Sequence, residues 1–262
     1  MELQLQGKVA IVLASSKGLG YAAAEELARE GALVTLVGRN EAVLHEAEAR
    51  MLAQTGSKPI LIQGDITKAE HIERIVANTM EQRGRIDILI NNCGGPSPGT
   101  FDQLSDEAWQ QGFELTLLSY VRSIRAVLPY MRKQQFGRIV NMTSSTHKQP
   151  IESLMLSSTF RVGVLGLAKT LAPDLARDQI LINTVGPGRY ATDRVIQLDR
   201  LAANHEGVDQ SFIEEREKAL IPLGRYGQPE EMGRLIAFLA SPTNSYMTGQ
   251  AFLVDGGAVR AL

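Results

Sequence analysis

Short apolar runs recur along the chain, and the stretches between them place apolar residues at helical spacing. The runs do not alternate strictly between apolar and polar residues, which is typical of strands buried on both faces of a parallel sheet. They predict six strands, over 9–13, 32–37, 59–63, 86–90, 138–142 and 180–185.

The intervening stretches predict helices because strong helix formers dominate them. Five helices are predicted: from 22 onward, over 41–51, from about 68 onward, over 106–133 and over 152–177. Thr67 is expected to cap the third of them, and Pro173 predicts a kink or break in the last. Strands that alternate with helices predict an α/β fold, since right-handed crossovers permit little else. We therefore expect one doubly wound parallel sheet, with helices on both faces, in a single domain over residues 1–262.

The turn over 14–20 joins the first strand to the first helix. Such a turn directs unpaired backbone N–H groups and the positive end of a helix dipole at one point, which suits a phosphate. Gly18 and Gly20 would let the ligand approach the backbone. Glycines also end strands for steric reasons, so this pair alone is a weak signal.

Composition narrows the class of protein. With 262 residues and 44% hydrophobic content the chain can bury a full core, and no linker or low-complexity tract divides it. A net charge of -2 offers no basic face for nucleic acid, and no apolar run reaches the ~20 residues that span a bilayer. The first residues lack the apolar core of a signal peptide.

Cysteine and histidine usage points away from disulfides and metals. The single cysteine, Cys93, excludes an internal disulfide and fits a reducing cytoplasm, where we expect the protein to reside. The histidines are scattered without ligand spacing, so no metal site is expected.

The end of the second strand indicates which dinucleotide the fold would bind. An acidic residue there favours a free ribose 2'-hydroxyl, whereas an arginine favours a 2'-phosphate. Here the acid is absent, and Arg39 and Lys17 are both placed to pair with that phosphate. We expect NADP(H) rather than NAD(H); the alternative is that both residues are solvated surface charges.

Together the motifs identify a family. The sequence resembles the short-chain dehydrogenase/reductases, and within them the 3-oxoacyl-acyl-carrier-protein reductases, over nearly its whole length. The motifs are the turn over 14–20, Asp65, the polar strand end over 91–94, Pro187-Gly188 with Thr192, and the stretches 227–231, 246–250 and 254–257.

The resemblance implies a Rossmann sheet of seven strands, a nicotinamide dinucleotide and a homo-oligomer, commonly a tetramer. It implies that 193–225 is a mobile lid over a small carbonyl or alcohol substrate. The implied cofactor residues are Ala14, Ser16, Lys17, Gly18, Leu19 and Gly20 at the phosphates, with Arg39; Asp65 and Ile66 at the adenine; Asn92, Cys93 and Gly94 at the riboses; and Pro187, Gly188, Tyr190 and Thr192 at the nicotinamide.

The catalytic positions depart from the family pattern, which is an Asn on the long helix, a Ser after the fifth strand, a Tyr thirteen residues on and a Lys four beyond. Ser144 supplies the Ser, but Ser157 stands at the Tyr position, Arg161 at the Lys position and Thr116 at the Asn position. A serine is a far weaker acid than a tyrosine and reaches less far. Losing a positioned general acid costs ~10² to 10⁴ in rate. Arg161 could still donate to ribose hydroxyls, as the family lysine does.

Three interpretations remain open. The proton donor of an oxidoreductase could have moved to Tyr190, His147 or Glu152, although Tyr190 could equally be a packing residue and His147 a solvated surface residue. The protein could instead bind the cofactor without turnover, as a sensor or assembly partner. It could also be a structural, oligomerising subunit. Tyr120, a turn beyond Thr116, is expected in a subunit contact.

Overall fold

The computed structural model describes residues 2–261 and contains one seven-stranded sheet. The strands are β1 (Val9–Val12), β2 (Leu33–Gly38), β3 (Ile60–Gln63), β4 (Ile88–Asn91), β5 (Gly137–Met142), β6 (Ile180–Pro187) and β7 (Ala251–Val254). They are all parallel, in the order β3-β2-β1-β4-β5-β6-β7. The order reverses beside β1, so the predicted doubly wound sheet is confirmed, as is the seventh strand that the resemblance implied.

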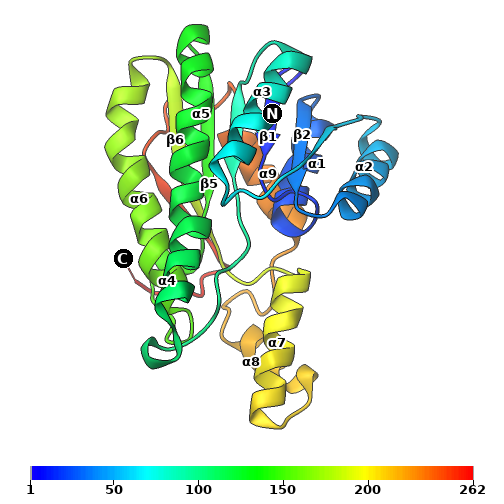
Figure 1. Cartoon of the computed structure of the whole chain (residues 1–262). Coiled ribbons are helices and arrows are strands. Elements are labelled where there is room, and N and C mark those ends of the chain that lie inside the picture. The colour runs from blue at the N-terminus through cyan, green and yellow to red at the C-terminus, as the bar shows by residue number, and fades with distance from the viewer. Residues whose placement is uncertain (1, 262) are drawn as a thin grey trace.

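Helices cover both faces of the sheet. They are α1 (Gly18–Arg29), α2 (Glu41–Thr55), α3 (Ala69–Arg83), α4 (Asp106–Phe113), α5 (Ser119–Gln134), α6 (Met155–Ala176), α7 (Asp193–Glu206), α8 (Gln210–Ala219) and α9 (Pro229–Leu239), with short helices at Phe101–Gln103, Glu114–Leu118 and Ser145–His147. Figure 1 shows α7 and α8 projecting together beyond one end of the sheet. No helix within residues 2–261 is long and apolar enough to cross a bilayer.

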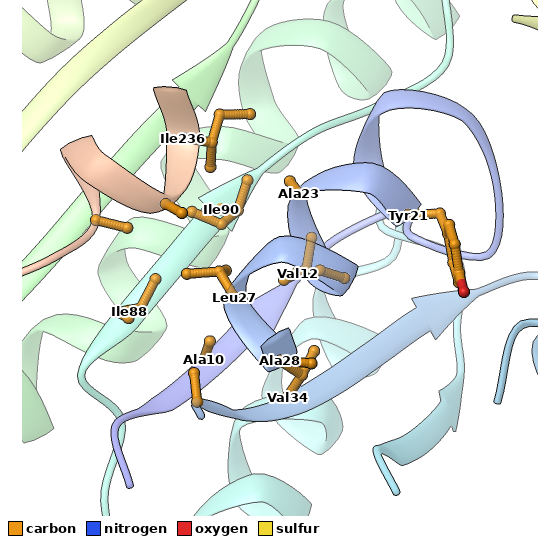
Figure 2. Packing of buried hydrophobic residues seen from close by; sticks show 14 of the residues in the cluster. Ala10, Val12, Tyr21, Ala23, Leu27, Ala28, Val34, Ile88, Ile90 and Ile236 are labelled. Carbon is orange, nitrogen blue, oxygen red and sulfur yellow. The ribbon is translucent and has the colours of Figure 1, made fainter. Parts of the chain in front are cut away.

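Successive residues of a strand supply two separate cores. Ala10 and Val12 of β1 pack with α1, α2 and α9, whereas Ile11 packs on the opposite face with α3, α5 and α6. Figure 2 shows the first core, in which Leu27 of α1 lies over β1 and β4 beside Ile236 of α9. Burial on both faces explains why the strand sequences do not alternate.

The cap predicted for α3 was wrong, and the structure refines two other helix predictions. Thr67 does not cap α3: its N–H and hydroxyl both donate to Asp65 Oδ1, at 2.9 and 2.8 Å, and Lys68 is the N-cap residue. The helix predicted over 106–133 is α4 and α5 joined by a π-helical turn, Glu114–Leu118. Helix α6 continues past Pro173 without a break, because Ala172 and Leu175 on either side are buried in the core and hold that turn.

Candidate active site

The carboxyl ends of the parallel strands meet along one edge of the sheet, where a cleft of about 810 Å³ opens. Most of the residues singled out from the sequence line it. They are Ala14, Ser16, Lys17, Gly18, Leu19, Arg39, Asp65, Ile66, Asn92, Cys93, Gly94, Ser144, Ser157, Arg161, Pro187, Gly188, Tyr190 and Thr192. Gly20 and Thr116 lie outside this lining.

Close packing around its backbone fixes the conformation of the turn after β1. Ala14 has a φ of 47°, a left-handed conformation that a residue with a Cβ rarely adopts. Gly20 does not line the cleft, but a Cβ there would lie 2.5 Å from both Ala14 O and Asn92 Nδ2. Asn92 Nδ2 donates to that same carbonyl at 3.1 Å. Gly20 therefore allows α1 to approach the strand ends.

The first turn of α1 keeps its N–H groups available. Its N-cap residue, Lys17, makes no side-chain hydrogen bond to them. Ser15, which sequence analysis missed, is wholly buried; its hydroxyl donates to Val12 O at 2.6 Å and accepts from Val37 N at 3.0 Å. This pair of bonds joins the ends of β1 and β2, and leaves a helix N-terminus that suits an anion.

Two cations and two anions lie around the end of β2 and the start of α1. Arg39 is exposed at the cleft, and Lys17 Nζ lies 3.4 Å from Asp193 Oδ2 at the start of α7. Burial raises the pKa of Asp65, but hydrogen bonds from Thr67 and the charge of Arg39 outweigh it, so the pKa is lowered overall. Asp65 therefore stays ionised beside Arg39.

The floor of the cleft holds the serine–arginine pair. Arg161 Nε donates to Ser157 Oγ at 3.1 Å, and Ser157 Oγ lies 3.1 Å from Thr146 Oγ1. The two residues are one turn apart on α6, so the helix places both side chains on the same face. Ser144 Oγ accepts from Thr146 N at 3.2 Å, which leaves its own O–H free to donate.

Arg161 is buried, with 5% of its surface exposed, and has no carboxylate partner among residues 2–261. Its Nη1 donates to Met142 O at 3.3 Å, and its Nη2 lies 3.8 Å from Cys93 Sγ. The guanidinium remains charged at any ordinary pH. The cleft floor therefore carries a fixed positive charge.

The other predicted catalytic residue, Thr116, is turned away from the cleft. It is wholly buried in the π-helical turn, and its hydroxyl donates to Gly112 O at 2.6 Å. The extra residue in a π turn rotates the following side chains, and a spacing count from the sequence does not register this rotation.

The alternative proton donors differ in their placement. Tyr190 lines the cleft, but its ring packs against Gly227, and burial, with Glu231 and Asp255, raises its pKa to about 12. Glu152 is exposed and outside the cleft lining. Tyr190 therefore keeps its proton at neutral pH, and Glu152 does not border the cleft.

Two expectations about buried residues were wrong. His147 is not a solvated surface histidine: it is 8% exposed, and its Nδ1 lies 2.9 Å from Thr143 Oγ1, outside the cleft lining. Tyr120 is buried within the subunit rather than at a contact between subunits. Its hydroxyl donates to Met142 O at 2.5 Å and lies 3.6 Å from Cys93 Sγ.

Residues that sequence analysis did not single out line the rest of the cleft. They are Gly95, Pro96, Gln111, Glu114, Leu115, Leu154, Asp193, Arg194, Val195 and Leu198, among others. Helix α7 is fixed there by Asp199, which is 2% exposed and accepts from Arg189 Nη1 at 2.5 Å and Tyr226 OH at 2.9 Å. These residues carry no local motif, because the packing of α7 over the strand ends brings them together.

Comparison with known proteins agrees with this geometry. Residues 13–259 match the family model described as enoyl-(acyl carrier protein) reductase. A 3-oxoacyl-[acyl-carrier-protein] reductase of Synechocystis sp. is 34% identical over 256 residues, which are 97% of this chain and 98% of that protein. The NADPH-dependent reductase BacG of Bacillus subtilis is 30% identical over 256 residues, 97% of this chain and 99% of that protein.

A solved structure shares the complete fold. The L-sorbose reductase from Gluconobacter frateurii, in complex with NADPH and L-sorbose, superposes with a TM-score of 0.95 and 31% identity, covering 100% of both chains. The sheet order, the cleft at its carboxyl edge and these full-length matches agree with one another, and the chain belongs to the short-chain dehydrogenase/reductase family of oxidoreductases.

Proposed function

We propose that the protein is an NADP(H)-dependent oxidoreductase that interconverts a small carbonyl compound and its alcohol with a modified active site. The observation that carries the proposal is the hydrogen-bonded pair of Ser157 and Arg161 on the floor of the cleft, with Ser144 bordering the same cleft. The relatives support the choice of cofactor, since BacG is named as NADPH-dependent and the L-sorbose reductase binds NADPH.

The lining of the cleft fits such a dinucleotide. The uncapped first turn of α1 suits the diphosphate, and Arg39 and Lys17 suit the 2'-phosphate. Asp65 and Ile66 would lie at the adenine, Asn92, Cys93 and Gly94 at the riboses, and Pro187, Gly188, Tyr190 and Thr192 at the nicotinamide. A nicotinamide bound there would supply the hydride for reduction of the carbonyl carbon and would take it up in oxidation of the alcohol.

The residues of the cleft floor would stabilise the oxygen of the substrate. The hydroxyls of Ser144 and Ser157 would donate hydrogen bonds to the substrate oxygen, on which negative charge would develop during reduction of the carbonyl. The charge of Arg161 lies directly behind Ser157 and would favour the developing negative charge. None of these three groups releases a proton near neutral pH, so water supplies the proton and becomes hydroxide.

Thr116 has no direct part in this proposal because its hydroxyl is already bonded within its helix. The segment 193–225 would act as the lid, with α7 bordering the substrate end of the cleft. A homotetramer remains our prediction from the family resemblance. If turnover is absent, the same cleft would serve a cofactor sensor or an oligomerising subunit.

The test compares two cofactors on two proteins. Fluorescence titration of the wild type should show NADPH bound at least ~10-fold more tightly than NADH, because a charged hydrogen bond is worth ~1.5 to 3 kcal/mol. Arg39→Gln should weaken NADPH alone, with NADH as the internal control. Equal binding of both would contradict the choice of cofactor, and no binding at millimolar concentrations would leave only a structural role. A panel of carbonyl compounds and alcohols then separates enzyme from sensor.

A further inference from the structure

Within residues 2–261, no carboxylate neutralises the positive charge of Arg161. A guanidinium has five N–H donors; within residues 2–261 those of Arg161 bond to Ser157 Oγ and Met142 O and, weakly at 3.8 Å, to Cys93 Sγ, and the phenol of Tyr120 is a further neighbour. None of these partners is a carboxylate. A buried charge is costly unless an opposite charge compensates it, so an anion in the cleft would bind favourably.

A second arginine, Arg194, lines the same cleft. Arg194, in the first turn of α7, lines the cleft and lies over Gly95, where a Cβ would stand 3.1 Å from Nη2. Its hydrogen bond within residues 2–261 is a long one, from Nη1 to Gln197 Oε1 at 3.4 Å. Nearby cations differ: Lys17 pairs with Asp193, and Arg189 pairs with Asp199 and Glu217.

Both arginines lie next to the loop after β4. Arg161 contacts Cys93 and Arg194 contacts Gly95, two residues further along the chain. The Cα atoms of two residues this far apart in sequence are at most ~7 Å apart, so both arginines line the cleft beside the same short stretch of loop. The cofactor would not neutralise them by itself, because α1, Lys17 and Arg39 already suit its phosphates.

We propose that Arg161 and Arg194 form an anion subsite, and that the substrate is an oxo acid whose carboxylate lies close to the carbonyl. This proposal rests on the oxidoreductase function proposed above and specifies its substrate class. The planar guanidinium matches a carboxylate through two parallel hydrogen bonds. Of the acids bordering this end, Asp193 pairs with Lys17 and Glu114 accepts from Gln110 Nε2 at 2.9 Å, so neither occupies the subsite.

The experiment compares matched acids and esters on the protein with NADPH. The substrates are 2-oxobutanoate and 3-oxobutanoate, each beside its methyl ester, which keeps the carbonyl and removes the charge. We expect kcat/KM for at least one acid to exceed that of its ester by ~10- to 100-fold, the range of a charged hydrogen bond. Arg194→Gln should reduce this ratio ~10-fold through KM, and Arg194→Lys should restore part of it.

Controls separate the subsite from cofactor binding and from folding. Arg200→Gln, an exposed arginine on the same helix, should leave the ratio unchanged. The Kd for NADPH should stay within threefold in Arg194→Gln. An equal loss for acid and ester together with weaker NADPH binding would assign Arg194 to the cofactor and overturn the proposal, as would preference for both esters.

A binding readout keeps the proposal testable without turnover. If neither acid nor ester reacts, the thermal unfolding midpoint of the NADPH-saturated protein is measured with each compound. A rise with the acids that Arg194→Gln abolishes supports the subsite, although the proposed oxidoreductase function fails. No rise with either acid overturns the subsite as well.

Discussion

Ser157 is shorter than the tyrosine of the family pattern, whereas Arg161 is longer than the lysine. A serine hydroxyl lies close to the helix backbone, whereas a guanidinium extends further than an ammonium and presents a planar fork. In this structure the fork extends past Ser157 to Met142 O and Cys93 Sγ. The pair therefore provides fixed charge and hydrogen bonds at the cleft floor but no group that titrates near neutral pH.

Restoring a phenol and an ammonium tests whether the rest of the site remains competent. Ser157→Tyr with Arg161→Lys should raise the rate of reduction of neutral ketones by ~10²-fold or more, because a positioned general acid contributes ~10² to 10⁴. The lysine should lower the pKa of the new phenol. The measurement is NADPH oxidation at saturating cofactor.

The matched control for this prediction removes one oxygen atom. Ser157→Phe with Arg161→Lys fills the same space without a hydroxyl, and it should show no such gain. If the phenol variant is no faster than the phenylalanine variant, the cleft no longer positions a carbonyl at this place.

Sequence spacing found the cleft residues but not their neighbours in space. Ser144, Ser157 and Arg161 could be placed because strand ends and helix turns have fixed geometry. Spacing did not show that Thr116 lies in a buried π turn outside the cleft lining, or that His147 is buried by packing against β6. Arg194 lies in the segment 193–225 that the family resemblance implied as a lid. Its contact with Gly95 could not be predicted, because it joins segments far apart in the chain.

At the level of elements, the strand predictions succeeded because continuous apolar runs directly reflect burial on both faces. The strands were each found within a few residues, except β7, which only the family resemblance implied. Helix boundaries were less accurate: α1 begins at Gly18 rather than at 22, and α6 at Met155 rather than at 152. Their first turns are set by tertiary contacts that periodicity does not report.

The crossing of α1 and α9 provides a prediction at this scale. A Cβ at Gly233 of α9 would lie 2.6 Å from Ala22 O of α1, and backbone cannot move aside cheaply. Gly233→Ala should therefore lower the free energy of unfolding by ~1 to 3 kcal/mol, measured by urea denaturation. Gly166→Ala in α6, with no heavy atom within 4 Å of the added Cβ, should be neutral or stabilising by up to ~1 kcal/mol. Equal effects would refute the close crossing.

The whole molecule combines the sheet with a projecting pair of helices, α7 and α8 (Figure 1). Among the described residues, this pair borders the cleft through the first turns of α7 alone. Asp199 fixes this pair by accepting from Arg189 and Tyr226. The predicted cofactor residues lie mainly on the sheet side, whereas Arg194 and Leu198 lie on the projecting side. In our proposal, substrate choice would therefore depend on the part of the fold that the sequence pattern predicted least well.

Acid sensitivity of the whole fold should come partly from His147. Its ring lies against Gly186 of β6, and burial, with the charges of Arg161 and Lys148, lowers its pKa below the ordinary value near 6.5. As the pH falls, His147 is protonated in the unfolded chain before it is protonated in the folded chain. The contribution of His147 to the free energy of unfolding is therefore constant above about pH 6.5 and declines below it. The slope from one histidine is at most ~1.4 kcal/mol per pH unit.

Urea denaturation between about pH 5.5 and 8 should show this decline. His147→Asn should flatten it, whereas His205→Asn, at an exposed position, should not. An unchanged slope in His147→Asn would mean that other groups cause the acid sensitivity.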